Sequence, residues 1–428
     1  MIRHKEETLP KRELKQLQLK RLKEVVLKGW KVPYYKTKMK NNGVTPEDIK
    51  TLDDLKKMPF MTKEDFLKAF PFGLLGVKMK NVVRIHATSG TTGTPSTAFY
   101  TEQDVDNWTE LIARNLNCIG VTANDIFQNT VSHGLFTGGM GFLQGAQRVG
   151  AMVIPFGGGM TIKQLEFMRD FNVTSFHAIP SFGLKLAETA KKEGVADELS
   201  LRLGMLGAEN WSEGTRKKIE EGLNIEAYDN YGLTELIGPG VACECPEKNG
   251  LHIWEDHFLC EVIDPETDEL LGPNADGEIV LTALTKEAFP AIRFRTRDLC
   301  SLLDEDICGC GRTHQRISRI KGRIDDGFII RGVNIFPKQI EEVIMKFPEI
   351  GYNYYIKLWT KGVMDEITVY AETNNFNDTH ARIALQREIT RALYETVRIR
   401  VNVELVEEDG IPRQEGKAKR LLDEREEK

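Results

Sequence analysis

The stretch Val173-Thr-Ser-Phe-His-Ala-Ile179 is a strand-like run of the length expected for a buried strand. A helical pattern follows over Phe182–Lys192, and another strand-like run covers Leu201–Leu206. Strands that alternate with helices of this length indicate βαβ units, which build a mainly parallel sheet. The alternation extends from Val149 to Tyr228. We therefore expect an α/β fold whose large domain has mainly parallel sheets flanked by helices.

The pattern changes twice further along the chain. Short strands predicted at Cys260–Ile263, Gly277–Leu284 and Leu299–Leu303 are separated by Pro, Asn and Gly turns, which indicates a β-rich subdomain at about 251–320. Beyond it, the order helix, strand, strand, helix, strand predicts a compact α+β unit. We expect an N-terminal domain over residues 1–323, which includes the β-rich subdomain, and a small C-terminal domain over residues 324–428.

Bulk composition limits the classes of function. The chain has 428 residues, 29% of them charged, and a net charge of −6, which argues against broad binding to nucleic acid. No stretch approaches the ~20 apolar residues that span a bilayer. The charged N-terminus has none of the features of a secretory signal. We expect a cytoplasmic protein without nucleic-acid or membrane partners.

A Gly/Thr-rich segment, Thr88-Ser-Gly-Thr-Thr-Gly-Thr-Pro95, lies between two predicted strands, Asn81–His86 and Thr97–Tyr100. Glycines let backbone amides approach a ligand closely, and hydroxyl groups add donors, so the segment suits the oxygens of a polyphosphate. A polar hairpin loop is the alternative, and the segment alone leaves both open. The residues expected to bind phosphate are Thr88, Ser89, Gly90, Thr91, Thr92 and Gly93.

The sequence has two close cysteine pairs, Cys308-Gly-Cys310 and Cys243-Glu-Cys245, and His252 and His257 lie downstream of the second pair. Thiolates and an imidazole suit tetrahedral Zn²⁺, although the C-x-C spacing is tighter than usual. The predicted structural site consists of Cys245, His252, Cys308 and Cys310. The alternative is four unrelated polar or buried side chains.

Four motifs follow one another along the chain. They are Ser89-Gly-Thr-Thr-Gly-Thr-Pro95, Tyr231-Gly-Leu-Thr-Glu235, Arg293-Phe-Arg-Thr-Arg-Asp298 and Gly322-Arg-Ile-Asp-Asp326. In this order they resemble the superfamily of adenylating enzymes that includes acyl- and aryl-CoA ligases, luciferase and peptide synthetases. Glu255-Asp-His-Phe258 and Arg331-Gly-Val-Asn-Ile-Phe-Pro337 look most like the phenylacetate-CoA ligase branch. The resemblance covers the chain from about Pro59 to Arg420.

The resemblance implies a role for each motif. Tyr231 would stack on adenine, Thr234 would reach a phosphate oxygen, and Glu235 would hold Mg²⁺. Asp298 would accept hydrogen bonds from the ribose hydroxyls; an ion pair with Arg295 or Arg297 is the alternative. The other residues implied for nucleotide binding are Gly207, Ala208, Glu209, Asp229, Asn230 and Gly232. The implied acyl pocket consists of His133, Phe136, Gly138 and Ala208.

The C-terminal motifs imply movement and catalysis. Asp325 would be the hinge about which the C-terminal domain rotates between two half-reactions, and Arg323 would contact the nucleotide. Lys417, in a loop beginning at Ile411, would neutralise charge when a carboxylate attacks the α-phosphate, with Lys419 as its competitor. One departure from the family pattern is Thr94, where many relatives have lysine.

The implied activity is that of an ATP-dependent aryl-acid CoA ligase of the phenylacetate type. It would act through an acyl-adenylate and use ATP, Mg²⁺ and coenzyme A, releasing AMP and pyrophosphate. An adenylyltransferase that uses only the first step, and a non-catalytic nucleotide-binding module, are the alternatives. The oligomeric state, including a homodimer, stays open.

Overall fold

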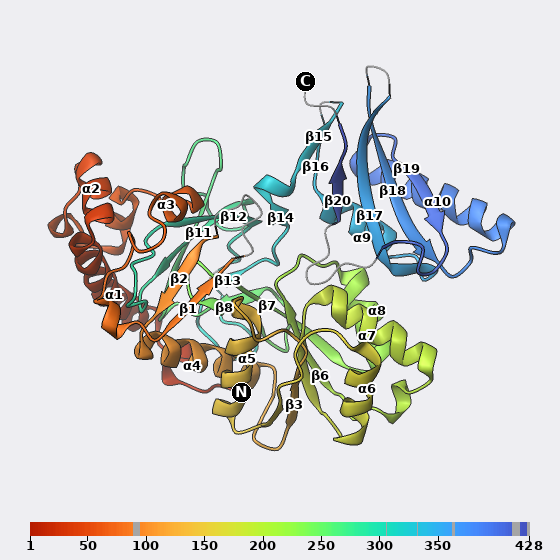
Figure 1. Cartoon of the computed structure of the whole chain (residues 1–428). Helices are drawn as coiled ribbons and strands as arrows, with labels where there is room; N and C mark the ends of the chain where they lie inside the picture. Colours follow the sequence, from red (N-terminus) through yellow and green to blue (C-terminus); the bar gives the residue numbers. More distant parts are fainter. Residues whose placement is uncertain (89–94, 305, 332, 362–363, 413–419, 426–428) are drawn as a thin grey trace.

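The computed structural model describes residues 1–88, 95–304, 306–331, 333–361, 364–412 and 420–425. Figure 1 shows a large N-terminal region and a smaller C-terminal unit that stands to one side of it. In the part of the chain that the structure describes, no helix combines the length and apolar character needed to cross a membrane.

The largest sheet has eight strands in the order β13-β9-β8-β7-β6-β5-β3-β4. Its strands are β3 (Ile126–Asn129), β4 (Met152–Ile154), β5 (Ser175–Ala178), β6 (Leu203–Gly207), β7 (Glu226–Leu233), β8 (Gly238–Glu244), β9 (Leu251–Ile253) and β13 (Arg316–Ile317). The neighbouring strands β4, β3, β5, β6 and β7 are parallel to one another. Strands β8, β9 and β13 extend the sheet beyond β7 with antiparallel pairing. The predicted α/β class with a mainly parallel sheet is confirmed.

Helices cover both faces of this sheet. They are α4 (Glu102–Cys118) and α5 (Thr137–Val149) on one face, and α6 (Thr161–Asp170), α7 (Pro180–Glu193) and α8 (Glu213–Leu223) on the other (Figure 1). Neighbouring strand residues point to opposite faces, so Met205 packs with the first helices and Leu206 with the second. Burial on both faces explains why the strands read as nearly continuous apolar runs.

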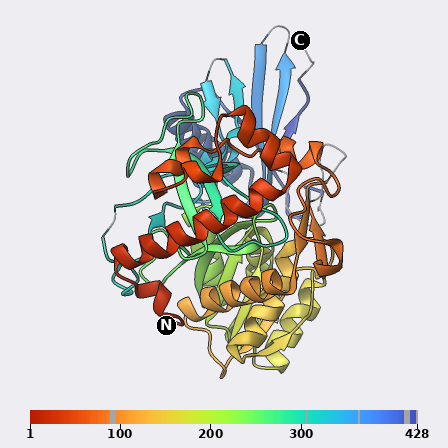
Figure 2. The same cartoon turned by 90° about the vertical axis from the view of Figure 1, so that its left-hand side faces the viewer.

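A second, antiparallel sheet has the order β10-β11-β12-β14. Its strands are β10 (Phe258–Ile263), β11 (Gly277–Ala283), β12 (Phe294–Cys300) and β14 (Gly322–Arg323). The hairpin of β1 (Arg84–Ala87) and β2 (Thr97–Tyr100) lies beside it, together with the N-terminal helices α1 (Lys11–Lys31), α2 (Pro33–Asn41) and α3 (Lys63–Lys68). Figure 2 shows these helices lying across one side of the molecule.

The C-terminal unit is a four-stranded sheet in the order β19-β18-β17-β20, together with two helices and a hairpin. Its elements are the hairpin β15 (Phe328–Ile330) and β16 (Val333–Ile335), then α9 (Pro337–Ile344), β17 (Ile350–Lys361), β18 (Met364–Thr373), α10 (Thr379–Val397), β19 (Asn402–Val406) and β20 (Leu421–Asp423). The predicted order helix, strand, strand, helix, strand is confirmed, and the hairpin β15–β16 and the strand β20 are elements that the pattern did not show.

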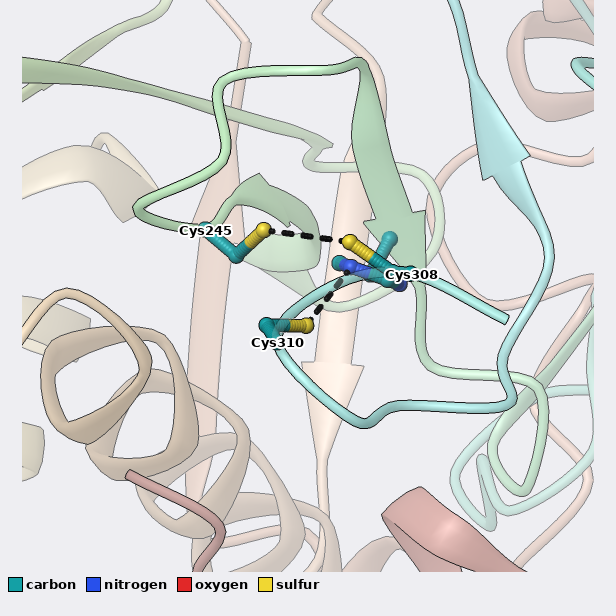
Figure 3. Close-up of side chains that lie close together, drawn as sticks. Cys245, Cys308 and Cys310 are labelled. Atoms are coloured by element: carbon teal, nitrogen blue, oxygen red, sulfur yellow. Dashed lines mark hydrogen bonds between the residues drawn. The ribbon is translucent and has the colours of Figure 1, made fainter. Parts of the chain in front are cut away.

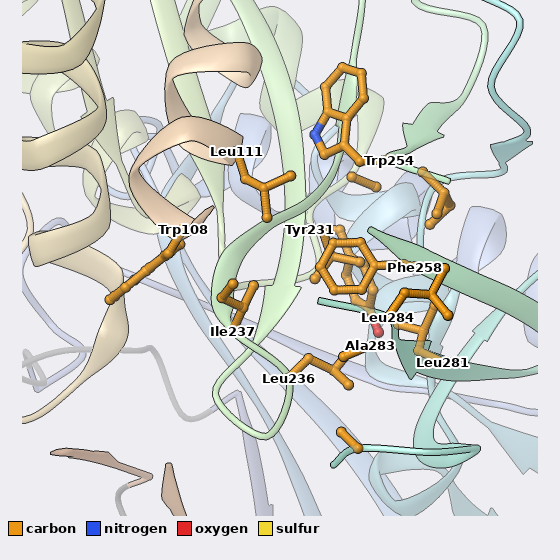
Figure 4. Packing of buried hydrophobic residues seen from close by; sticks show 14 of the residues in the cluster. Trp108, Leu111, Tyr231, Leu236, Ile237, Trp254, Phe258, Leu281, Ala283 and Leu284 are labelled. Atoms are coloured by element: carbon orange, nitrogen blue, oxygen red, sulfur yellow. The ribbon is translucent and has the colours of Figure 1, made fainter. Parts of the chain in front are cut away.

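The hydrophobic core is divided between two clusters. The first lies between α4, the large sheet and the second sheet, where Trp108, Trp254 and Phe258 are buried (Figure 4). The second joins α7 and α8 to α9 and β17, so it continues from the N-terminal region into the C-terminal unit.

Two elements differ from the sequence-based expectation. The strand predicted at Leu299–Leu303 lies earlier, at Phe294–Cys300, because Arg295 forms an ion pair with the buried Glu278 and the charged run fits in a strand. The glycine-rich stretch at Thr137, which the sequence pattern did not mark as a helix, begins helix α5. A Cβ atom on Gly141 would lie 2.6 Å from the Trp108 ring, so these glycines allow α5 to pack closely on α4.

Candidate active site

The end of strand β6 forms the first part of the site. A Cβ atom on Gly207 would lie 2.4 Å from the carbonyl oxygen of Asn230, so only glycine fits between β6 and β7. Ala208 follows with a φ of +72°, a left-handed conformation that is costly for a residue with a side chain. Glu209 accepts hydrogen bonds at 2.9 Å from both the backbone N–H and the hydroxyl of Ser181. The chain therefore turns sharply at the carboxyl edge of the sheet, where α/β proteins bind ligands.

The neighbouring end of β7 is held by polar side chains. Asn230 donates to the carbonyl of Leu206 at 2.8 Å, and Asp229 accepts from Arg319 at 3.1 Å. A Cβ atom on Gly232 would lie 2.2 Å from the carbonyl of Gly238, so this glycine lets β7 and β8 approach each other. These contacts fix the backbone that leads into Tyr231–Glu235.

Four residues from three motifs form one chain of hydrogen bonds. The Tyr231 hydroxyl donates to one carboxylate oxygen of Asp298 at 2.6 Å, and Arg323 donates to the other at 2.9 Å. Arg323 also donates to both carboxylate oxygens of Asp325, at 3.0 and 3.1 Å. Asp298 and Arg323 face each other across β12 and β14, which explains the pairing. The contact with Arg323 replaces the alternatives of Arg295 and Arg297.

Burial changes the acid–base properties of this chain. Desolvation raises the pKa of Asp298 to about 6, although Arg323 and the Tyr231 hydroxyl act in the opposite direction. The Tyr231 ring is only 9% exposed and packs in the first core cluster near Phe258 (Figure 4). Asp298 is therefore a carboxylate that a further hydrogen-bond donor would help to keep ionised.

Glu235 lies in the turn between β7 and β8 and is buried. Burial raises the pKa of its carboxyl group, while Lys63, Arg323 and Ser96 lower it in part. Ser96 closes the base of the Gly/Thr loop, because its backbone N–H donates to the Thr88 hydroxyl at 3.1 Å. The base of the predicted phosphate loop and the predicted magnesium ligand are therefore neighbours.

The predicted acyl-pocket segment meets the same turn. The hydroxyls of Thr137 and Thr234 are 3.2 Å apart, which joins the first turn of α5 to the Tyr231–Glu235 motif. Gly138 is the second residue of α5, and Phe136 precedes the helix with 51% of its surface exposed.

Sequence reasoning missed Asn129, at the end of β3. Its amide donates to the carbonyl of Gly139 at 2.8 Å and to Nε2 of His133 at 2.9 Å, and its oxygen accepts from Nδ1 of His177 at 3.0 Å. Burial lowers the pKa of His133, so a neutral ring that accepts at Nε2 carries its proton on Nδ1. A polar residue at the end of a buried strand was the available signal.

Several predicted residues lie outside the part of the chain that the structure describes. They are Ser89, Gly90, Thr91, Thr92, Gly93, Thr94 and Lys417. The described ends of the two segments are Thr88 and Pro95 for the loop, and Arg420 after Lys417. Their roles stay predictions.

The four predicted zinc ligands come together between β8, β9 and the segment before β13. All four ligand atoms lie within 4.8 Å of one another, and the thiols of Cys245, Cys308 and Cys310 point toward a common centre (Figure 3). The two sulfurs of Cys245 and Cys308 are 3.6 Å apart, and Cys310 Sγ is 3.4 Å from His252 Nε2. Two Zn–S bonds of 2.3 Å at a tetrahedral angle place sulfurs about 3.7 Å apart.

The imidazole of His252 has the orientation that a metal ligand needs. Its Nδ1 is 3.2 Å from the carbonyl oxygen of His314, which requires the proton on Nδ1 and leaves Nε2 free to bind a cation. Three members of the cluster are buried. The arrangement fits a closed, four-coordinate structural site.

Comparisons with protein families cover most of the chain. A family profile for AMP-binding enzymes matches residues 17–283, and one for the C-terminal domain of AMP-binding enzymes matches residues 332–425. A phenylacetate-coenzyme A ligase of Thermus thermophilus is 41% identical over 97% of this chain and 98% of its own length. A phenylacetate-coenzyme A ligase of Escherichia coli is 43% identical over 97% of this chain and 96% of its own length.

Among solved structures, a 2-hydroxyisobutyryl-CoA ligase matches in more than one state. Its postadenylation state, with an acyl-AMP bound, superposes with a TM-score of 0.91 at 27% identity, covering 98% of this chain and 91% of the other. Its thioesterification state, with acyl-AMP and CoA bound, gives a TM-score of 0.73 at 28% identity, covering 98% of this chain and 92% of the other.

Proposed function

The chain belongs to the phenylacetate-CoA ligase family of AMP-binding enzymes, and we propose that it joins an aryl acid of the phenylacetate type to coenzyme A. In the first step, a carboxylate oxygen of the acid attacks the α-phosphorus of ATP, giving acyl-AMP and pyrophosphate. In the second step, the CoA thiol attacks the acyl carbon and AMP leaves. Neither step requires a side-chain nucleophile, because positioning and charge neutralisation lower the barrier.

One observation carries the proposal: the hydrogen-bond chain Tyr231–Asp298–Arg323–Asp325. It joins three motifs that are far apart in the sequence, the last of which immediately precedes the C-terminal unit. We assign Asp298 to the two ribose hydroxyls, since a carboxylate held by two neighbours keeps lone pairs for further donors. Arg323, already paired with Asp298, would contact the nucleotide from the same side.

Glu235 is proposed to hold Mg²⁺, and Thr234 to reach a phosphate oxygen. A buried carboxylate whose pKa is raised gains most when a divalent cation restores a counter-charge beside it. Its neighbour Ser96 lies at the base of the loop assigned to the phosphates. When bound, the ion would neutralise charge on the polyphosphate.

Lys417 is proposed to neutralise the charge that develops as the carboxylate approaches the α-phosphate. Asp325 is proposed as the hinge for rotation of the C-terminal unit between the two steps. Asp325 follows β14, the last strand of the N-terminal sheets, and precedes the first hairpin of the C-terminal unit, so a backbone change there moves the entire unit.

The test is a screen for AMP release over a panel of aryl and short aliphatic acids, with and without CoA. The proposal predicts CoA-dependent AMP release that is fastest with phenylacetate or a close aryl analogue. An adenylyltransferase would instead catalyse pyrophosphate exchange without CoA-dependent release of AMP. A non-catalytic module would give neither signal with any acid.

We further propose that Cys245, His252, Cys308 and Cys310 hold a structural Zn²⁺. The ligand atoms are spaced as tetrahedral zinc requires, and the four residues supply the four ligands of a closed structural site. Metal analysis of purified protein should give about one zinc per chain. A stoichiometry near zero after purification without chelator would refute this site.

A further inference from the structure

The C-terminal unit meets helices α7 and α8 through its main chain. Glu188 on α7 accepts a hydrogen bond from the backbone N–H of Tyr352 at 2.8 Å. Lys218 on α8 donates to the carbonyl of Phe347 at 3.0 Å and also to the carbonyl of Ile350. Two side chains of the N-terminal region therefore bind main-chain donors and acceptors in the connection after α9 and in the first residues of β17. Figure 1 shows this connection directly beside α7 and α8.

The two side chains are of opposite charge and are both largely removed from water. Burial raises the pKa of Glu188 to about 7 and lowers that of Lys218 to about 8, and each group's charge partly opposes the shift of the other. Docking of the C-terminal unit thus desolvates this pair. The hydrogen bonds that Glu188 and Lys218 make to the main chain of residues 347–352 offset the free-energy cost of this desolvation. These hydrogen bonds exist only while the C-terminal unit is docked on α7 and α8.

A second contact makes the interface sterically specific. A Cβ atom on Gly214, in the first turn of α8, would lie 2.9 Å from the carbonyl oxygen of Met345 and 3.0 Å from its Cβ. Next to it, the Glu341 carboxylate accepts hydrogen bonds from the Thr215 hydroxyl at 2.7 Å and from the Ser212 backbone N–H at 3.2 Å. The start of α8 therefore fits the end of α9 only if residue 214 has no side chain.

The arrangement of the two parts corresponds to one step of the reaction. The chain superposes better on the postadenylation state of 2-hydroxyisobutyryl-CoA ligase than on its thioesterification state. We infer that Glu188, Lys218 and Gly214 are positioning residues that select the adenylation arrangement, by docking the C-terminal unit on α7 and α8. This inference rests on the proposed two-step function, since it concerns the balance between the two half-reactions.

Gly214→Ala gives the sharpest test. Alanine is a better helix former than glycine, so the substitution favours α8 itself and disturbs only the contact with Met345. We expect formation of acyl-AMP from acid and ATP, measured in a single turnover without CoA, to slow about tenfold, which is a shift of about 1.4 kcal/mol in the docking equilibrium. Conversion of synthetic acyl-AMP and CoA to thioester should stay within about twofold of wild type.

Lys218→Met should change the same half-reaction, because it leaves two carbonyls of the connection without their donor. The matched control is Lys217→Met, one residue earlier on the exposed side of α8, whose ammonium pairs with Glu221 at 3.7 Å. The control should leave both half-reactions unchanged. A parallel loss of both half-reactions in Gly214→Ala and Lys218→Met, or no loss of adenylation in either, would overturn the inference.

Small-angle X-ray scattering provides a readout that does not depend on the reaction. Wild-type protein should scatter as the docked arrangement, and Gly214→Ala should scatter as a more open one. Identical profiles would contradict the interface. If wild type forms no acyl-AMP from any acid, the proposed function fails, and the scattering result still decides the interface.

Discussion

The carboxylates of the candidate nucleotide site and the cluster of Cys245, His252, Cys308 and Cys310 are two polar centres with opposite designs. Asp298 is buried but only partly satisfied, and its pKa is raised to about 6. The ligand atoms of the cysteines and the histidine instead lie within 4.8 Å of one another, so each faces the other three. The comparison teaches that burial alone does not mark a functional centre. A buried group that can accept further hydrogen bonds, as Asp298 can, is able to bind a substrate reversibly, whereas four ligands that face one another suit a permanently bound metal ion.

The largest effect on turnover should come from Lys417, the lysine proposed to act at the nucleotide site. Lys417→Ala should slow adenylation on the order of 10²- to 10³-fold, the usual cost of removing a charge-stabilising group. Conversion of synthetic acyl-AMP to thioester should persist, because attack on the α-phosphorus, where Lys417 is proposed to act, occurs in the first step only, whereas the second step takes place at the acyl carbon. Rapid-quench measurement of each half-reaction checks this, with Lys419→Ala as the matched control. Equal loss in both half-reactions would remove the assigned role.

Asp298→Asn should weaken AMP binding by about 10- to 100-fold. A hydrogen bond to a charged group is worth roughly 1.5–3 kcal/mol, and the amide loses the charge that the ribose hydroxyls and Arg323 use. Titration calorimetry measures the change. Asp276→Asn, at an exposed ion pair with Lys321, serves as control and should bind AMP as wild type does. Unchanged affinity in Asp298→Asn would place the ribose elsewhere.

Nucleotide affinity should also depend on pH. Desolvation raises the pKa of Asp298 to about 6, and the ionised form is the better acceptor for ribose hydroxyls. Affinity should therefore fall as pH decreases through 6, with a loss of about tenfold at one unit below the pKa, and binding near pH 6 should release a proton. The dependence should be absent in Asp298→Asn. A flat profile between pH 5 and 7 in wild type would show that this carboxylate does not titrate on binding.

The smallest effect on catalysis should come from the cluster of Cys245, His252, Cys308 and Cys310. Cys310→Ser should lose the zinc and lower the thermal midpoint by several degrees, since about 1 kcal/mol shifts it by ~2–4 °C for chains of 150–250 residues. Turnover of the remaining folded protein should stay within about twofold. Metal analysis, scanning calorimetry and AMP release check the three parts, with Cys260→Ser as the control outside the cluster. A large loss of turnover at full folding would mean that the cluster takes part in catalysis.

The large sheet could be predicted because its strands are buried on both faces and alternate with regular helices, as Val173–Ile179 and Leu201–Leu206 do. Helix α5 was hidden because glycines normally weaken a helix. Here Gly141 and Gly145 are needed for the close approach of α4, where Trp108 and Ile112 fill the space of their missing side chains. Such a tertiary constraint leaves no periodic signal.

The candidate site was predictable as a set of residues and not as a set of contacts. Motif order indicated that Tyr231, Asp298 and Arg323 act together. The alternative to a ribose role for Asp298 is an ion pair with Arg295 or Arg297, whereas the structure pairs Asp298 with Arg323, because the register of β12 and β14 places them opposite each other. By contrast, Cys245, His252, Cys308 and Cys310 were predicted as one cluster because their side chains suit a single metal ion, and the structure brings them together. Register across strands that are distant in sequence cannot be read from composition or spacing.

The central claim is that a carboxylate oxygen of the acid attacks the α-phosphorus of ATP. The most direct measurement uses phenylacetate, or the best acid of the panel, labelled with ¹⁸O in both carboxylate oxygens, in a complete reaction with ATP and CoA. Mass spectrometry of the released nucleotide should find AMP that carries one ¹⁸O atom. Unlabelled AMP, or ADP together with labelled inorganic phosphate, would contradict the acyl-adenylate.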